Sequence, residues 1–253
     1  MTWRLGIAIF TAGLIFADSK NQVFSDFTTP SPLPKGSTLV IGVVGGWERW
    51  DAPQRIVRRV ALKIRDQGIP GVHVETVENH KIELAEELVR QSFPTPGDAN
   101  IVLYGNSLGG SATVRFAQRL QDLGYRVQMM VVIDSVGKGD EVVPANVAKA
   151  INIFQRDSWP VVGQSEITAA DPSKTTILGN LKFSYKGKSV DLETEPWVRR
   201  TFTKGHLMLE YDPEVWALVE RHILSAVPPP ERNRSAPAAR SSEGPTATVR
   251  RPQ

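Results

Sequence analysis

The chain has 253 residues, of which 41% are hydrophobic and 23% charged, so it is long enough and apolar enough to bury a sizeable core. The 30 basic residues exceed the 27 acidic residues, which gives a net charge of +3, and the chain contains no cysteine. The lack of cysteine excludes disulfides and the lipidated cysteine of a bacterial lipoprotein.

The N-terminal segment has the pattern of an export signal. Arg4 gives it a positive start, residues 5–16 are uncharged and largely apolar, and Ala17 is small enough to end a signal peptide. The apolar run is too short to span a bilayer comfortably. We expect residues 1–17 to be a signal peptide or an N-terminal anchor. Residues 18–36, with three prolines before the closing glycine, are expected to be a leader into the fold.

Strand and helix patterns then alternate along the chain. Short apolar, β-prone runs predict strands, and apolar residues at helical spacing predict helices. Asp51 and Pro53 are expected to open the first helix, which Gly68 ends. The expected strands cover residues 38–44, 72–77, 101–104, 127–133 and 148–154, with helices over 51–68, 81–91 and 112–123. The alternation predicts an α/β fold with a doubly wound, mostly parallel sheet that binds ligands at the carboxyl ends of its strands.

Ser107 stands between two glycines directly after one of these strands. Gly105 to Gly109 have the G-x-S-x-G pattern of an abrupt turn from strand to helix, and both flanking elements are present in the sequence. The glycines avoid Cβ collisions across the turn, and the strained backbone lifts the serine Oγ clear of the sheet edge. The pattern therefore predicts that Ser107 is an accessible nucleophile.

The region from residue 158 to 200 does not follow the alternation. Residues 182–185 and 189–192 flank Gly187, which predicts a hairpin over the site or a terminal strand with an excursion. Further on, Asp212 and the proline after it announce a final helix with a capping carboxylate.

The end of the chain differs in composition from the rest. Residues 228–253 are rich in Pro, Ser, Ala and Arg, which predicts a disordered tail. Its five arginines and two glutamates give a charge of +3, which equals the charge of the whole chain. The expected folded domain, residues 37–227, is therefore close to neutral and has no basic face of the kind that binds nucleic acid.

Taken in order, residues 39–224 resemble the α/β-hydrolase superfamily, and they look most like its compact thioesterase-like and lipase-like branches. The resemblance implies the α/β-hydrolase fold with a short lid or hairpin insert. It also implies the chain order Ser, then Asp or Glu, then His in a loop before the final helix. Only His206 and His222 follow Ser107, and His222 lies inside that helix. Ser107 and His206 are thus the implied nucleophile and base.

The resemblance leaves two candidates for the carboxylate that orients the histidine. Asp134 follows the strand after the serine strand, and Asp157 follows the next apolar run. We favour Asp134, because the chain leaves its strand abruptly there, while Asp157 adjoins Arg156 in a polar stretch that suits a solvated ion pair. Asp171 has the pattern of a turn residue and is a poor third choice.

The resemblance also implies two backbone N–H groups that bind the oxyanion. One belongs to Leu108, the residue after the nucleophile, and the other to Trp47 in the loop after the first strand. Gly45 stands where lipases have a histidine, which leaves the exact second donor open. Trp47 and Trp50 are candidates either for the pocket mouth or for covering the sheet edge. The implied lid makes Trp159, Phe183 and Trp197 candidates for substrate contact or for the core of the lid.

These features together predict a serine hydrolase that cleaves a carboxylic ester or thioester through an acyl-enzyme on Ser107. An acyltransferase of the same fold and a non-catalytic hydrolase-fold binding protein are the alternatives. No cofactor or metal is expected, because the sequence has neither a phosphate-binding glycine loop nor a histidine cluster. The expected partner is a small acyl ester or thioester, with no nucleic acid and weak membrane association through the N-terminus. The protein is expected to be periplasmic or secreted, and its oligomeric state is left open.

Overall fold

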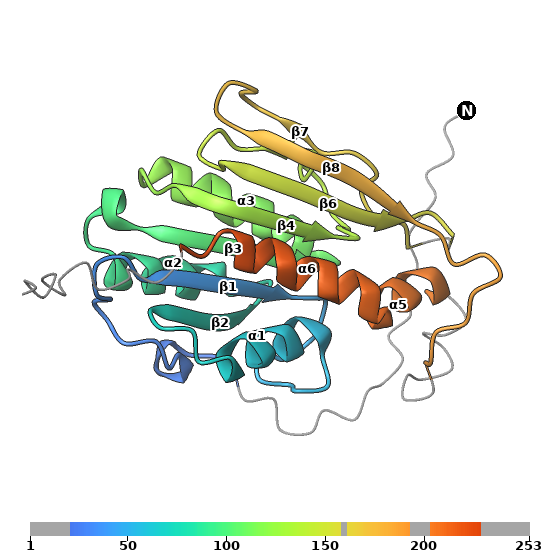
Figure 1. Ribbon diagram of the computed structural model, residues 1–253, viewed down its shortest axis with the longest axis horizontal. Helices are drawn as coiled ribbons and strands as arrows, with labels where there is room; N and C mark the ends of the chain where they lie inside the picture. The colour runs from blue at the N-terminus through green and yellow to red at the C-terminus, as the bar shows by residue number, and fades with distance from the viewer. Residues whose placement is uncertain (1–20, 158–160, 193–202, 229–253) are drawn as a thin grey trace, which may run out of the picture.

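The predicted strands assemble into one six-stranded parallel sheet (Figure 1). The computed structural model describes residues 21–157, 161–192 and 203–228. The sheet has the order β2-β1-β3-β4-β6-β8, and every neighbouring pair is parallel. Its strands are β1 (Thr38–Val44), β2 (Val72–Glu78), β3 (Asn100–Asn106), β4 (Val127–Ile133), β6 (Lys149–Gln155) and β8 (Thr176–Phe183). A second, two-stranded sheet pairs β5 (Val142–Val143) with β7 (Thr168–Ala169).

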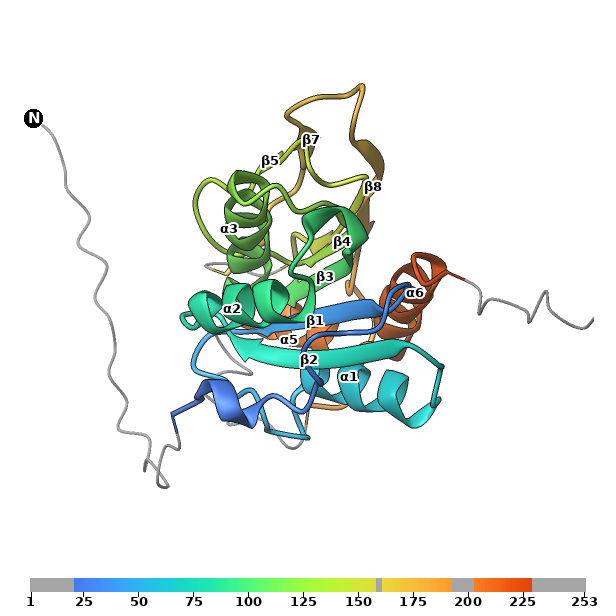
Figure 2. The same ribbon diagram turned by 90° about the vertical axis from the view of Figure 1, so that its left-hand side faces the viewer.

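Helices cover both faces of the large sheet, as Figure 2 shows. One face carries α2 (Ile82–Ser92) and α3 (Leu108–Asp122), and the other carries α1 (Ile56–Asp66) and α6 (Pro213–Ser225). A short helix, α5 (Lys204–Tyr211), directly precedes α6, and two 3-10 turns lie at Phe24–Asp26 and Pro96–Asp98. The expected doubly wound, mostly parallel α/β sheet is therefore confirmed.

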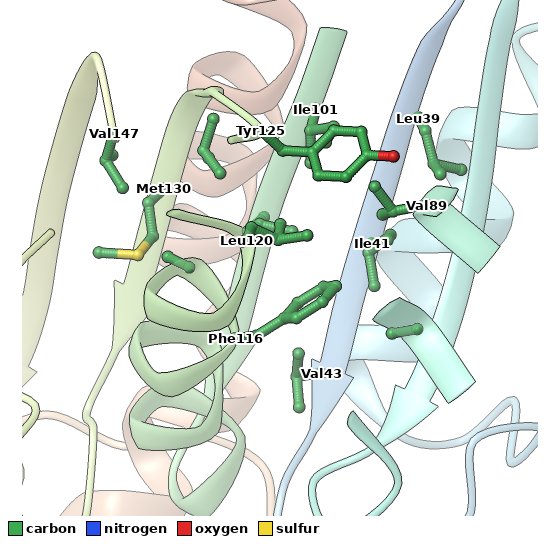
Figure 3. Close-up of a cluster of buried hydrophobic side chains, with 14 of the residues drawn as sticks. Leu39, Ile41, Val43, Val89, Ile101, Phe116, Leu120, Tyr125, Met130 and Val147 are labelled. Carbon is green, nitrogen blue, oxygen red and sulfur yellow. The ribbon is translucent and has the colours of Figure 1, made fainter. Parts of the chain in front are cut away.

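Strand β1 shows how the core is divided between the two faces. All seven of its residues are buried, as expected for a parallel strand with helices on both sides. Leu39, Ile41 and Val43 pack on the α2 and α3 side, while Val40 and Val44 pack on the α1 and α6 side. Figure 3 shows Phe116 and Leu120 of α3 projecting toward this strand. The end of β1 is thus fixed from both faces.

Residues of the expected leader are bound to the edge strand β2. The Gln22 side chain donates to the Thr76 carbonyl at 2.9 Å and accepts from the Glu78 N–H at 3.1 Å, so it pairs with the strand edge. The buried Glu75 carboxylate accepts from the backbone N–H groups of Thr28 at 2.7 Å and Thr29 at 2.9 Å. The leader is therefore part of the folded domain from residue 21.

Both ends of the chain extend past the residues that the structure describes. The expected signal peptide or anchor, residues 1–17, and the tail from residue 229 onward lie outside the described ranges, as do Trp159 and Trp197. Within residues 21–157, 161–192 and 203–228, no helix combines the length and the apolar character that crossing a membrane requires.

Two of the predicted elements differ in the structure. The first helix begins at Ile56 and not near Asp51, because Arg49 binds the Asp51 carboxylate at 2.9 and 2.8 Å and keeps it from capping a helix. The hairpin around Gly187 is not formed. The terminal-strand alternative is the one observed, since β8 pairs in parallel with β6 and residues 189–192 form no strand. Phe183, at the end of β8, packs against the hydrophobic core.

Candidate active site

The backbone at Ser107 has the strained conformation that the sequence predicts. Ser107 links β3 to α3 with φ 58° and ψ −126°, a region that side chains other than glycine rarely adopt. A Cβ atom at Gly105 would overlap the backbone of Gly109, and one at Gly109 would overlap the Val43 carbonyl. Ser107 itself is partly exposed, while its neighbour Asn106 is buried. The turn therefore presents the serine at the carboxyl edge of the sheet.

Asp134 lies beside Ser107 because β3 and β4 are neighbouring parallel strands. The Ser107 N–H donates to the carbonyl of Ile133 at 2.9 Å, and the Val136 N–H donates to the carbonyl of Ser107 at 3.1 Å. The Ser107 backbone is thus hydrogen-bonded to one residue before Asp134 and to one after it. Asp134 has no exposed surface, so its carboxylate must be satisfied by protein donors.

His206 supplies one of those donors. Its Nδ1 lies 2.6 Å from Oδ2 of Asp134, and its side chain is only 7% exposed. The Asp134 carboxylate also accepts from Gln155, through the backbone N–H at 3.1 Å and the side-chain Nε2 at 3.0 Å. Since an ionised carboxylate only accepts, the proton of a neutral imidazole sits on Nδ1, and Nε2 keeps a lone pair.

The sequence places Ser107, Asp134 and His206 in the chain order of the hydrolase pattern, and the sheet topology places the first two on adjacent strand ends. The chain has a doubly wound α/β fold built on a parallel sheet. One local expectation is wrong, because His206 lies on α5 and not in a loop. Leu207, Met208 and Leu209 form a buried run there that packs into the core, which favours a helical turn.

Solved structures similar to this chain include a cutinase-like protein, esterases and thioesterases, all at low identity. A cutinase-like protein from Cryptococcus sp. is 14% identical with a TM-score of 0.45, covering 79% of this chain and 98% of its own. An esterase from the archaeon Pyrobaculum calidifontis is 13% identical with a TM-score of 0.42, covering 76% of this chain and 75% of its own. A thioesterase of the prodiginine biosynthetic pathway in Streptomyces coelicolor is 11% identical with a TM-score of 0.41, covering 85% and 98%. No protein-family profile matches the sequence, and the search of curated proteins finds no match. Proteins this distant can share a fold without sharing an activity.

Backbone strain is concentrated at this edge of the large sheet. Among the described residues, only three that are not glycine have a positive φ, namely Trp47 at 56°, Ser107 at 58° and Asp134 at 41°. They follow β1, β3 and β4, which are consecutive in the sheet. Such conformations cost about 1–3 kcal/mol each and persist where the surrounding structure enforces them, often at functional sites. The three strained residues therefore gather at one edge of the sheet, as is typical of a functional site.

The loop after β1 approaches the start of α3. Gly46 lies against Leu108, since a Cβ atom on Gly46 would come within 2.8 Å of the Leu108 Cδ1. Leu108 is the first residue of α3, where backbone N–H groups have no partner inside the helix. The two tryptophans of the loop differ, because the Trp47 side chain is 92% exposed while Trp50 is buried. Trp50 is therefore packed inside the protein, while Trp47 stands in solvent.

Asp157 lies apart from the Asp134–His206 pair. Its carboxylate accepts from the Ser184 hydroxyl at 2.9 Å and from the Tyr185 backbone N–H, just beyond β8. The Tyr185 hydroxyl in turn donates to Asp212, the residue that caps α6, at 2.8 Å. These contacts tie the end of β8 to the final helix, so Asp157 has a structural place in the fold.

The substitution Asp157→Asn is expected to lower stability in a pH-dependent way. The Tyr185 N–H, helped by the Ser184 hydroxyl, holds the pKa of Asp157 below its ordinary value. The stabilisation is therefore present above the unfolded pKa of about 3.9 and lost as the pH falls through the folded pKa. At neutral pH the loss should be under about 1 kcal/mol, because the group is largely solvated. Thermal unfolding of both proteins from pH 7 down to pH 2 measures it, and a difference that does not shrink as the pH falls would contradict this account.

Sequence reasoning missed the residues that hold Asp134 in place. Gln155 is the last residue of β6, and its two bonds to Asp134 cross from one strand end to the next. Gly163 lies so close that a Cβ atom there would overlap the Asp134 carboxylate. The only signal in the sequence was position, because Gln155 directly follows a predicted strand at the edge of the sheet where ligands bind.

The other histidines lie outside this constellation. His80 pairs with Glu78 at 3.3 Å, and burial lowers the pKa of both His73 and His222. In the described part of the chain, no group of three or more His, Cys, Asp or Glu side chains could hold a metal ion. A cleft of about 400 Å³ between α2 and α3 is lined by none of Ser107, Asp134 and His206.

Proposed function

We propose that this protein is a serine hydrolase that cleaves a carboxylic ester or thioester through an acyl-enzyme on Ser107. The observation that carries the proposal is the buried Asp134–His206 pair, with its 2.6 Å contact, at the sheet edge where Ser107 stands in a left-handed turn. A buried carboxylate against an imidazole and a strained serine on the adjacent strand end are the parts that acyl transfer requires.

In the proposed reaction, Nε2 of His206 takes the proton from the Ser107 hydroxyl as Oγ attacks the acyl carbonyl carbon. Asp134 keeps the imidazole in the Nδ1–H form and stabilises the imidazolium that results. Backbone N–H groups at Leu108 and in the loop after β1 stabilise the negative oxygen. The tetrahedral intermediate collapses, the C–O or C–S bond breaks, and His206 returns its proton to the leaving alcohol or thiol. Water, activated by His206, then releases the acid from the serine.

The decisive experiment is covalent labelling with a fluorophosphonate probe, followed by mass spectrometric mapping of the labelled peptide. The wild-type protein should be labelled on Ser107, and His206→Ala should label far more slowly because the base is missing. The matched control is His222→Ala, which removes the other histidine that follows the serine and should label like the wild type. Correctly folded wild-type protein that takes up no label would overturn the proposal and favour a non-catalytic binding protein.

A further inference from the structure

Both backbone polar groups of Gly45, just after β1, are bound by side chains. Its N–H donates to Oε2 of Glu48 at 3.1 Å. Its carbonyl accepts from Nδ2 of Asn79 at 2.6 Å and from the Glu48 N–H at 3.4 Å. The Asn79 amide also reaches the Val44 carbonyl at 3.3 Å. Because the polar groups of Gly45 are already engaged, Gly45 cannot itself donate to an oxyanion.

The direction of the Gly45 carbonyl fixes the direction of the next N–H. The Gly45–Gly46 peptide is trans, so the carbonyl of Gly45 and the N–H of Gly46 point in opposite directions. Asn79 directly follows β2, which borders β1 on the side away from β3. A Gly45 carbonyl held by Asn79 therefore fixes the direction in which the Gly46 N–H points.

Close packing places Gly46 beside Leu108. The Cα of Gly46 lies so near Leu108 that an added Cβ would come within 2.8 Å of that side chain. The Glu48 carboxylate on the far side of the loop is buried, and Arg55 Nη1 lies 3.7 Å from its Oε1, which offsets the negative charge near the site. The loop is thus braced by Asn79 and by Glu48.

We propose that Asn79 is a positioning residue for oxyanion stabilisation, which fixes the Gly45 carbonyl and so aims the Gly46 N–H at the space beside Leu108. The inference rests on the proposed function, and it moves the second donor from Trp47 to Gly46. A donor held in place before the reaction needs no reorganisation as charge develops on the acyl oxygen. Asn79 acts through the loop and does not touch the substrate.

The test compares Asn79→Ala and the equally sized Asn79→Asp with wild type, using 4-nitrophenyl butyrate as substrate. Both variants lose the amide donor, and kcat should fall about 10- to 100-fold, as expected when a transition-state donor is misdirected. KM and the pKa read from the pH profile of kcat/KM should not change, because the Asp134–His206 pair is untouched. The matched control is His80→Ala, the adjacent residue with no bond to the loop, which should keep wild-type kcat.

A backbone substitution separates the two candidate donors. Replacing Trp47 by its α-hydroxy acid counterpart turns that N–H into an ester oxygen and keeps the indole, so kcat should stay within a few-fold of wild type. A loss of about 100- to 1000-fold would return the donor role to Trp47 and overturn the inference. Wild-type kcat in both folded Asn79 variants would also overturn it. If Ser107→Ala still hydrolysed the ester, the proposed function itself would fail, which is a different result.

Discussion

Replacing Ser107 with alanine should abolish turnover of simple esters, with kcat falling by about 10⁶-fold, because the proposed acyl-enzyme forms on the Ser107 Oγ. The turn itself should survive, because alanine is no more strained than serine at a φ of 58°. The rate of 4-nitrophenyl butyrate hydrolysis measures the effect. The circular dichroism spectrum and the melting temperature verify that the variant is folded.

The double variant Ser107→Ala with His206→Ala sharpens this test. If the two residues act as one unit, removing the second costs almost nothing once the first is gone. Losses that multiply would show that the two side chains act independently. That outcome, or Ser107→Ala turnover within tenfold of wild type, would contradict the nucleophile assignment.

The second large effect is expected from Asp134→Asn, for which kcat should fall by about 10⁴-fold. Three donors converge on this carboxylate, namely the backbone and side-chain amides of Gln155 and Nδ1 of His206. An asparagine offers one acceptor oxygen in place of two and presents an NH₂ group to one of the donors. The imidazole is then driven toward the tautomer with its proton on Nε2, which cannot accept the proton of the serine hydroxyl.

Asp157→Asn is the control for that substitution, because it makes the same chemical change at the other candidate carboxylate. Its contacts to Ser184 and Tyr185 lie at the end of β8, so kcat should remain within a few-fold of wild type. The rate of fluorophosphonate labelling provides a second readout for both variants. A large loss from Asp157→Asn together with a small one from Asp134→Asn would reverse the choice of acid.

The fold was predictable wherever burial imposes a simple pattern. Strands β1 and β4 match their predicted bounds to the residue, because each is a mostly apolar run that is buried along nearly its whole length. Strand β8 was harder to recognise, since it lies at the edge of the sheet and much of its length is exposed. The start of α1 was missed because Asp51, which resembles a helix cap in sequence, is bound by Arg49.

The candidate site, like the fold, could be predicted from the sequence only in part. Ser107 and His206 were reachable from a local motif and from chain order, which are properties of sequence alone. The choice between Asp134 and Asp157 depends on which carboxylate faces the imidazole, and two aspartates after neighbouring strands carry the same sequence signal. The roles of Gln155 and Asn79 depend on contacts between strand ends, which only the assembled sheet brings together.

The attachment of residues 21–36 to β2 bears on where the folding unit starts. A protein shortened to begin at the first strand would lose the Gln22 side chain that occupies the backbone groups of β2, leaving a bare strand edge open to pairing with another molecule. It would also leave the buried Glu75 with Arg65, 2.7 Å away, but without the threonine donors. We therefore expect a protein that begins at the first strand to aggregate more readily than one that keeps residues 21–36.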